Sequence, residues 1–268
     1  MSEITQALFV AWQQPKTRRF HPVARLARLA KGSGELHFEF AYVEGVRAAQ
    51  ADGFQPFLAF PDVNEVYRSR DLFPTFENRI MSESRLDYPQ YIDRLGLAPD
   101  HANPLDVLGR SGGSRATDAV ELFPLPAFEP VSGRYTTYFL AHAVRHLPPE
   151  AHERIHRSQP GERLLVMFDC QNTFDSAAMA LRTEDWVIVG CMPSYLLEDA
   201  ITLWKNCGGG EYFQVFVEKV NSHPAPMHQW LLCRLEASWP DNFVPYSTAR
   251  YQPLNGDAVR VRQAVQPV

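Results

Sequence analysis

Prolines interrupt the chain near its middle and separate two halves of different character. Phe123-Pro124-Leu125-Pro126 is followed closely by Glu129-Pro130, and proline neither continues a helix nor donates a backbone hydrogen bond. With 268 residues in all, each half is long enough to fold as a small domain. After Pro240 the sequence has few apolar residues and many turn formers, which predicts poor order. We therefore predict a first module (1–125), a proline-rich linker (126–134), a second module (135–240) and an extended tail (241–268).

The first module combines strand and helix patterns. Residues Leu36–Tyr42 alternate between large apolar side chains and smaller or polar ones such as Glu39. This period of two predicts a half-buried strand with Glu39 on its solvated face. The other elements expected here are a strand at Ala7–Trp12 and helices at Val43–Asp52 and Tyr88–Leu95, the second capped by Gly96.

The second module is richer in β-branched and aromatic residues, which favour strands. It opens with a strand at Tyr135–Leu140, and five more are expected at Arg163–Asp169, Ala177–Arg182, Trp186–Val189, Tyr212–Val220 and Gln229–Leu235. A helix at Ser194–Lys205 would turn an apolar stripe inward, formed by Leu196, Leu197, Ala200, Ile201 and Trp204. Short strands around one helix predict a small barrel of the OB or SH3 kind. The expected fold class is therefore α+β, with a mixed N-terminal module followed by this barrel.

Charge and cysteine content limit the classes of function. The chain carries 26 basic and 31 acidic residues, a net charge of −5, whereas proteins that coat duplex DNA present a basic face. Any nucleic-acid binding must therefore come from a local pocket. The four cysteines have no zinc-finger spacing and are expected as core thiols. No apolar run is long enough for a membrane span, and the polar start lacks a signal-peptide pattern, which predicts a cytoplasmic protein without a membrane partner.

One segment matches a metalloprotease motif. His152-Glu153-Arg154-Ile155-His156 is H-E-x-x-H, a spacing that places two imidazoles on one helical face beside a general base. Prolines at 148, 149 and 160 shorten the helix, and Arg154 and Arg157 would repel a metal cation. A zinc hydrolase is therefore a remote alternative. No nucleophile elbow or phosphate loop occurs, so we expect no catalytic residues, no cofactor and no metal.

A basic stretch lies near the start of the chain. Between Lys16 and Lys31 it contains six basic residues, among them Arg18 and Arg19, and no acidic ones. A solvated face is the simpler interpretation. The alternative is an accessory patch at Lys16, Arg18 and Arg19 that binds phosphate or an acidic partner.

The segment Asn172-Thr173-Phe174-Asp175 places an aromatic ring beside a carboxylate. A ring offers a stacking surface for a nucleobase. A carboxylate repels phosphate but accepts a hydrogen bond from a sugar hydroxyl, and only a terminal nucleotide has that hydroxyl free. The simpler alternative is that Asp175 caps a turn and Phe174 lies in a core.

The same segment carries a resemblance to the HIRAN domain, which occurs in fork-remodelling ATPases and alone in many bacterial proteins. The matching pattern, within about Tyr135–Leu235, consists of Asn172, Phe174, Asp175, Ala178, Val189, Gly190 and Pro193. The resemblance implies an OB-like barrel that grips the 3′ end of single-stranded DNA. Asp175 would accept from the terminal hydroxyl, Phe174 would line the base pocket, and Asn172 would brace the turn.

Further positions follow from the same resemblance. A strand ending in Val144-Arg145-His146 resembles the family's first strand, and His146 stands where a second stacking aromatic is placed. The sequence departs from the family at Thr173, where proline is usual, and at Ser194 and Tyr195, where a basic residue often meets phosphate. The implied DNA-binding residues are Arg145, His146, Asn172, Phe174, Asp175, Ser194 and Tyr195.

The first half resembles the N-terminal subdomain of HipA-type toxin kinases, over about Ala7–Phe123. The likeness rests on Phe57–Pro61, Leu72–Arg79, Tyr91–Leu97, Leu105–Leu108, Gly112-Gly113 and Asp118-Ala119. Residues for the kinase body are missing. Because this subdomain helps dock the toxin and its antitoxin partner, the resemblance implies a protein-interaction module.

These observations predict a non-enzymatic protein that recognises single-stranded DNA or its 3′ ends, coupled to a protein partner in toxin–antitoxin regulation or phage defence. The first alternative is a regulatory interaction protein that does not bind DNA; the net acidity, Thr173 and Ser194 favour it. The zinc hydrolase at His152, Glu153 and His156 is the remote alternative.

Overall fold

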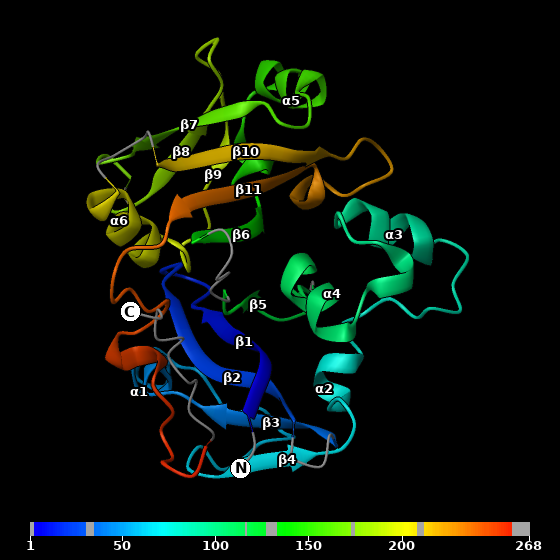
Figure 1. Cartoon of the computed structure of the whole chain (residues 1–268), viewed down its shortest axis with the longest axis vertical. Helices are drawn as coiled ribbons and strands as arrows, with labels where there is room; N and C mark the ends of the chain where they lie inside the picture. Colours follow the sequence, from blue (N-terminus) through cyan, green and yellow to red (C-terminus); the bar gives the residue numbers. More distant parts are fainter. Residues whose placement is uncertain are drawn as a thin grey trace. The chain divides into compact units, whose positions relative to one another are not determined.

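The computed structural model describes residues 3–30, 35–115, 117–126, 133–172, 175–207 and 212–258. Contacts divide the chain into two compact units. Unit 1 contains the chain up to Glu83, Asn103–Leu125 and the segment from Val244, and unit 2 contains Ser84–Ala102 and Pro126–Phe243. Each unit is built around one antiparallel sheet with helices (Figure 1), so the expected α+β class is confirmed at this level.

The units differ from the expected division in two segments. Ser84–Ala102, predicted in the first module, packs in unit 2, where Asn221 Nδ2 donates to the Arg94 carbonyl at 2.9 Å and Lys219 Nζ contacts the Asp93 carboxylate at 2.6 Å. The segment from Val244, predicted as an extended tail, packs in unit 1. Both segments are joined to their units by tertiary contacts that local sequence patterns do not encode.

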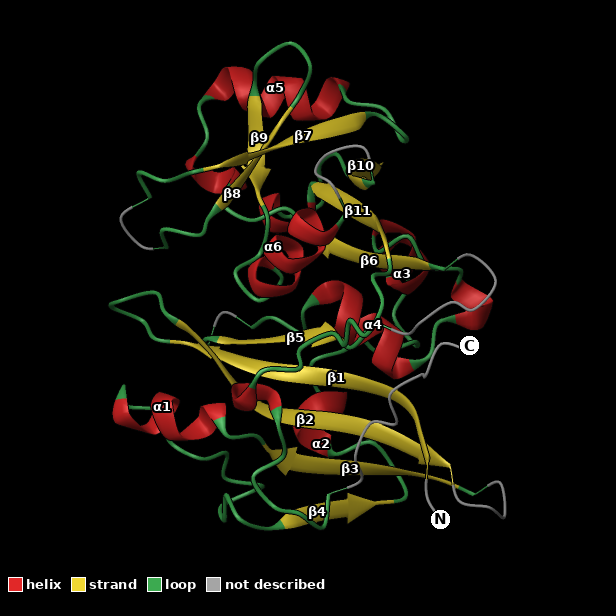
Figure 2. Cartoon of the chain, turned by 60° about the vertical axis from the view of Figure 1, so that its left-hand side comes forward, coloured by secondary structure: helices red, strands yellow, loops and turns green. Residues whose placement is uncertain are grey.

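Unit 1 contains a five-stranded sheet in the order β4-β3-β2-β1-β5. Its strands are β1 (Glu3–Gln13), β2 (Phe20–Ala30), β3 (Leu36–Tyr42), β4 (Val66–Ser69) and β5 (Val120–Pro124). Its helices are α1 (Gly45–Ala51), α2 (Pro74–Glu77), α4 (Pro104–Ser111) and the 3₁₀ turn η4 (Ala249–Tyr251). α1 and α2 lie against this sheet (Figure 2).

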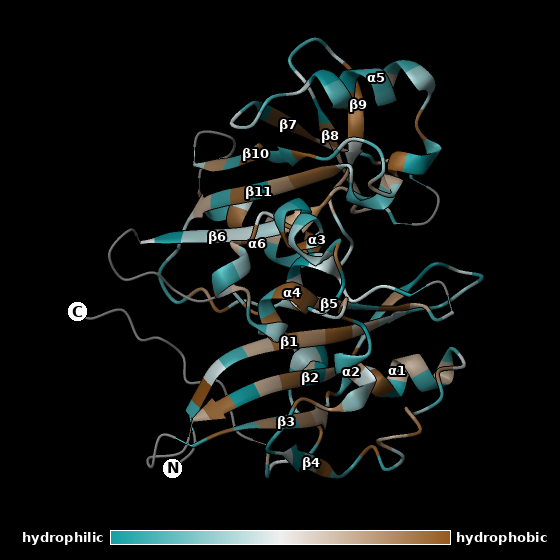
Figure 3. Cartoon of the chain, turned by 90° about the vertical axis from the view of Figure 1, so that its right-hand side faces the viewer, coloured by the Kyte–Doolittle hydropathy of each residue, from teal (hydrophilic) through white to brown (hydrophobic). Residues whose placement is uncertain are grey.

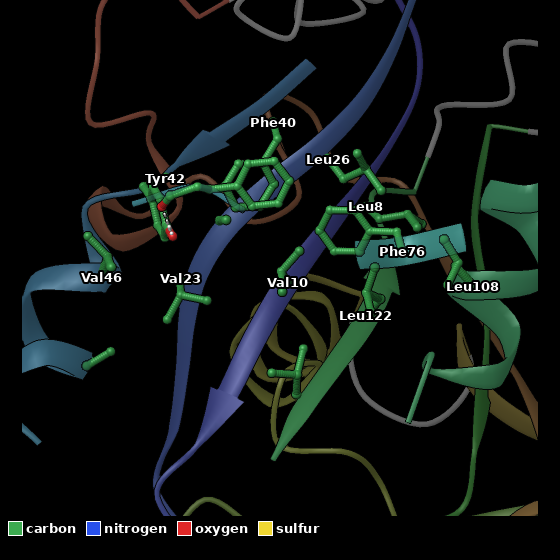
Figure 4. Close-up of a cluster of buried hydrophobic side chains, with 14 of the residues drawn as sticks. Leu8, Val10, Val23, Leu26, Phe40, Tyr42, Val46, Phe76, Leu108 and Leu122 are labelled. Atoms are coloured by element: carbon green, nitrogen blue, oxygen red, sulfur yellow. Dashed lines mark hydrogen bonds between the residues drawn. The ribbon is translucent and has the colours of Figure 1, made fainter. Parts of the chain in front are cut away.

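One face of this sheet carries the main core of unit 1 (Figure 4). Alternate residues of the strands point into it, and Phe40 stacks on Phe60 with ring centroids 3.9 Å apart. Tyr42 is buried there and donates its hydroxyl to the Phe60 carbonyl at 2.8 Å. Burial raises the pKa of Tyr42 to about 12, because the phenolate loses its hydration. The Tyr42 hydroxyl therefore serves as a permanent donor that ties the Phe57–Phe60 loop to β3.

The other face of the sheet is also buried, which corrects the prediction of a half-buried strand at Leu36–Tyr42. Glu39 is 1% exposed and forms ion pairs with Arg25 at 3.3 Å and with Arg68 at 3.0 Å. The C-terminal segment covers this face, since the rings of Tyr246 and Tyr251 pack on Phe9 with centroids 5.3 and 5.0 Å apart. The predicted extended tail is thus wrong for Val244–Ala258, whose aromatic side chains complete a second core layer.

We expect Tyr251→Ala to lower the free energy of unfolding by about 3 kcal/mol, because it removes a large buried ring from Phe9. The matched control is Tyr212→Ala, since Tyr212 is 55% exposed and its loss should change stability by less than about 0.5 kcal/mol. Urea unfolding of both variants measures the difference. If Tyr251→Ala loses no more free energy of unfolding than the control does, the Tyr251 ring does not stabilise unit 1.

Unit 2 contains a six-stranded sheet in the order β6-β11-β10-β7-β8-β9. Its strands are β6 (Arg134–Leu140), β7 (Arg163–Phe168), β8 (Met179–Arg182), β9 (Ile188–Cys191), β10 (Phe213–Val220) and β11 (Leu231–Ser238). Its helices are α3 (Tyr88–Arg94), α5 (Pro149–Arg157) and α6 (Leu197–Asn206). All six predicted strands occur, each within a few residues of its expected place.

The sheet of unit 2 curls until its two edges meet. His142, just beyond β6, exchanges two backbone hydrogen bonds of 2.9 Å with Cys191 at the end of β9. α5 presents a largely hydrophilic surface (Figure 3). α3 ends at Arg94 and is capped as predicted by Gly96, which has φ +66°, while the N–H of Leu97 donates to the Ile92 carbonyl at 3.2 Å. Among the described helices, none has the length and apolar character to cross a membrane.

Candidate nucleic-acid interface

The predicted turn after β7 is held by its own side chains. Asn172 Oδ1 accepts the N–H of Asp175 at 3.1 Å, and Asn172 Nδ2 donates to the Asp169 carboxylate at 3.1 Å. Asp175 Oδ1 accepts the N–H of Ala177 at 2.9 Å. Asn172 therefore joins the two sides of the loop, and Asp175 caps the turn into β8. Among the described residues, the second carboxylate oxygen of Asp175 has no hydrogen-bond partner in the chain.

Strand register places this turn beside two other segments of the predicted interface. Asp169 and Ala178 close the loop, with the Asp169 N–H donating to the Ala178 carbonyl at 2.8 Å. The next residue, Met179, accepts the N–H of Met192 at 2.8 Å, and Cys191 pairs with His142. The 169–178 loop, the start of the segment into α6 and the turn after β6 therefore share one end of the curled sheet.

Gly190 makes this arrangement sterically accessible. A Cβ at Gly190 would lie 2.9 Å from the Ala141 Cβ and 3.1 Å from the His142 carbonyl oxygen, and its φ is +155°. Gly190 lies within β9. Its role is to allow the backbone after β6 to approach β9 closely.

Arg145 and His146 lie at this end of unit 2, but not in a strand. β6 ends at Leu140, and Val144–His146 form a 3₁₀ turn that follows Ala143 at φ +63°. Pairing with Cys191 redirects the chain at His142, which explains why the predicted strand through His146 is wrong. Both side chains are exposed, and Arg145 Nε donates to His146 Nε2 at 3.0 Å.

The other predicted contacts have different surroundings. Tyr195 is only 6% exposed, and its ring meets His142 edge to face at 6.3 Å, so its role as a surface contact is corrected to one of packing. Ser194 is half-buried before α6. Phe174 and Thr173 lie outside the described residues.

Lys16, Arg18 and Arg19 are exposed in the turn between β1 and β2, in unit 1. Arg19 lies 3.9 Å from Asp52, which also accepts from His21 at 2.8 Å. Farther along the basic stretch, Arg25 is 3% exposed and paired with Glu39. Among its described residues, the stretch is therefore neither one solvated face nor one continuous patch, because Lys16, Arg18 and Arg19 are exposed, Arg28 is half-buried and Arg25 is buried.

The H-E-x-x-H segment lies within the nine-residue helix α5, where its two imidazoles contact other groups of unit 2. His152 Nε2 donates to the Val144 carbonyl at 2.8 Å, and the rings of His152 and His156 pack on Trp230 at 5.3 and 4.5 Å. Glu153 is exposed. Within the described part of the chain, no group of three or more His, Cys, Asp or Glu residues is arranged to hold a metal. The two histidines instead fix α5 to unit 2.

The sequence analysis did not predict that two aromatic residues at this interface are exposed. Phe168 ends β7 and is 40% exposed, and Trp204 of α6 is 37% exposed. The prediction that Trp204 faces inward is wrong, because Leu203 at 0% exposure takes that place. Cys170, expected as a core thiol, is also exposed. Phe168 ends the continuous apolar run Leu164–Phe168, and such a run does not indicate which of its residues faces solvent.

Unit 1 has a surface pocket that the sequence analysis also missed. Its volume is about 420 Å³, and its walls include Trp12, Phe54 and Phe57. Asp118 lies at its edge, bound by Arg79. These residues are far apart in the chain, so only the folded sheet assembles them.

Comparison with known proteins gives little further information. A scan against protein-family models and a search of curated proteins find no match. Among solved structures, the chain is similar to a protein from Lactobacillus plantarum, with 16% identity over 38% of this chain and 89% of that chain and a TM-score of 0.30. A likeness at this level carries no argument about function.

We expect purified protein, after dialysis, to contain less than about one tenth of an equivalent of zinc, because both imidazoles of α5 are engaged with Val144 and Trp230. Added zinc should leave the melting temperature unchanged. A rise in melting temperature that His156→Ala abolishes would contradict this assignment.

Arg154 generates a pH-dependent contribution to stability. Its Nε donates to both carboxylate oxygens of Asp185 at 2.9 Å, and it also binds Glu162. The hydrogen bond from Arg154, aided by Thr183, holds the pKa of Asp185 well below its usual 3.8. A carboxyl group with a depressed pKa stabilises the fold above its unfolded value and loses that contribution as the pH falls through its folded value.

We therefore expect Asp185→Asn to lower the melting temperature at neutral pH by no more than a few degrees, since the Asp185 side chain is 56% exposed and water screens the pair. The difference from the wild type should shrink as the pH falls below about 3.8. Glu184→Gln serves as the control, because Glu184 is its exposed neighbour. A difference that stays constant down to acid pH would show that the charge of Asp185 is not involved.

Proposed function

We propose that this protein is a non-enzymatic DNA-binding protein that recognises single-stranded DNA or its 3′ ends through unit 2. In this proposal unit 2 is an OB-like barrel of the HIRAN kind, and unit 1 resembles the HipA-type subdomain and docks a protein partner. The setting would be toxin–antitoxin regulation or phage defence.

The observation that carries the proposal is the construction of the Asn172–Asp175 turn. Asn172 uses both ends of its amide inside the loop, whereas Asp175 uses one oxygen to cap the turn. The second oxygen is left to accept an external donor. A terminal 3′-hydroxyl is such a donor, and an internal phosphate is not.

Exposed groups beside the turn support a polynucleotide ligand. Arg145 and His146 are both exposed at the same end of unit 2, and a guanidinium binds phosphate while an imidazole stacks on a base. Because these groups are few, the proposed contact is local, in keeping with the net charge of −5.

The partner-binding part of the proposal rests on unit 1. Leu58, in the segment that resembles the toxin subdomain, is fully exposed, and the aromatic pocket at Trp12, Phe54 and Phe57 lies in the same unit. Exposed apolar groups beside a concave aromatic surface are typical of protein-binding sites.

One alternative has a specific observation in its favour. Tyr195 is buried and Ser194 carries no charge, so the position where HIRAN domains often meet phosphate offers little binding energy here. An interaction protein that does not bind DNA would show the same features, and the experiment below separates the two.

The deciding measurement is fluorescence anisotropy with a short labelled single strand that ends in either a 3′-hydroxyl or a 3′-phosphate, at one fixed salt concentration. We expect tighter binding of the hydroxyl end. Asp175→Asn should weaken that binding about tenfold, because it removes a hydrogen bond to a charged acceptor, and should abolish the preference between the ends.

The control is Ser176→Ala, the exposed neighbour of Asp175 in the same turn, which should bind like the wild type. Asparagine keeps an oxygen for the N–H of Ala177, so the turn itself is preserved. If the wild type binds neither strand at tens of micromolar, the DNA proposal fails and the interaction protein is the better description.

A further inference from the structure

An aromatic pair lies at the surface where β7 ends. The rings of Phe168 and Trp204 meet edge to face, with centroids 5.3 Å apart and an interplanar angle of 77°. Figure 1 shows α6, which carries Trp204, beside the end of β7 and the start of β8. Both residues are more than a third exposed. The two rings form an apolar surface that water covers in the isolated chain.

This aromatic pair is not needed to complete the core. On the same helix, Leu197, Ala200 and Leu203 are 4%, 0% and 0% exposed and provide the packing against the sheet. Trp204 projects from the helix beyond them. Its ring contacts Phe168, so the two residues hold each other in place at the surface.

The pair is continuous with the proposed DNA-binding turn. Asp169 directly follows Phe168 in the chain, so their Cα atoms are about 3.8 Å apart. The Asp169 carboxylate accepts from Asn172, and Asn172 in turn binds the N–H of Asp175. Phe168 is thus linked through Asp169 and Asn172 to Asp175, the proposed acceptor of the terminal hydroxyl.

We propose that Phe168 and Trp204 form a stacking platform for an unpaired base of a single strand, at a nucleotide inward from the 3′ end. This inference rests on the proposed function of unit 2 and specifies its ligand. Base–aromatic stacking tolerates any base and contributes strongly to single-strand binding. A duplex would not fit, because its bases are stacked on one another and their faces are not free.

The charges around the platform select the orientation of the strand. Asp169 and Asp175 lie on the side of the turn and repel phosphates. Lys205, which follows Trp204, is exposed and attracts them. The base therefore lies over the exposed face of one ring of the pair, since rings at 77° share no common face, while the phosphate backbone passes on the Lys205 side of α6.

The test uses the full chain and a labelled oligothymidylate with a 3′-hydroxyl, together with the same strand carrying abasic sites next to its terminal nucleotide. We expect Trp204→Ala to weaken binding of the intact strand about tenfold. Trp204→Phe, which keeps an aromatic face, should restore most of the affinity. Abasic sites should weaken binding to the wild type but not weaken binding to Trp204→Ala any further.

Two controls separate stacking from a folding defect. Trp186 is 79% exposed and follows β8, whereas the proposed DNA-binding turn precedes β8. Trp186→Ala should therefore bind like the wild type. The melting temperatures of Trp204→Ala and Trp186→Ala should match. The intact strand should also quench tryptophan emission of the wild type more than that of Trp204→Phe, because a stacked base quenches the indole directly.

The outcomes test the aromatic platform separately from the end-binding function of unit 2. If Trp204→Ala binds intact and abasic strands as the wild type does, while Asp175→Asn still loses the hydroxyl preference, the platform is overturned and the end-binding function stands. If the wild type binds no oligonucleotide, both are overturned.

Discussion

Closure of the second sheet depends on the bridge between His142 and Cys191. Its two hydrogen bonds of 2.9 Å pair the edge of β9 with the chain leaving β6, so the edges of this sheet are not left open along that stretch. The bridge forms only because Gly190 has no Cβ to meet Ala141 and His142. Burial and the charge of Asp169 raise the pKa of the Cys191 thiol, which keeps it neutral beside the loop. The missing side chain at Gly190 thus allows the 169–178 loop, the segment leading into α6 and the turn after β6 to lie at the same end of unit 2.

Unit 1 depends on a contact that is remote in sequence. Tyr246 and Tyr251 pack on Phe9, and farther along the same C-terminal segment the Asp257 carbonyl accepts from Arg68, which is paired with the buried Glu39. Desolvation lowers the pKa of Arg25, and its partner Glu39 offsets only part of that shift, so the ion pair does not fully compensate for the burial of both charges. Alternation in Leu36–Tyr42 correctly predicts the strand. It cannot predict that the polar face is buried, because the covering residues lie more than two hundred positions away.

The sequence predicts the elements of unit 2 better than their exact orientation. Asn and Asp side chains often accept backbone hydrogen bonds in turns, so the hydrogen bonds of Asn172 and Asp175 can be predicted from the sequence. The structure contains them. The phase of α6 is harder to predict, since steps of three and of four residues both fit a helix. Packing selects Leu203, leaving Trp204 outside. The 3₁₀ turn at Arg145 and His146 depends on the bridge at His142, and no local pattern reports that bridge.

An acidic chain needs a particular kind of interface if it is to bind DNA. Affinity that comes from neutralising phosphates requires many cations, and the described surface near the turn offers Arg145 and Lys205 against Asp169 and Asp175. A contact built on one hydroxyl acceptor and one aromatic platform avoids that requirement, because neither a hydroxyl nor a base face carries charge. The carboxylates of Asp169 and Asp175 then repel a DNA strand whose phosphate backbone continues past the turn. They favour a strand that ends there. In the proposed function, the same acidic groups that argue against a general DNA-binding protein supply the selectivity for an end.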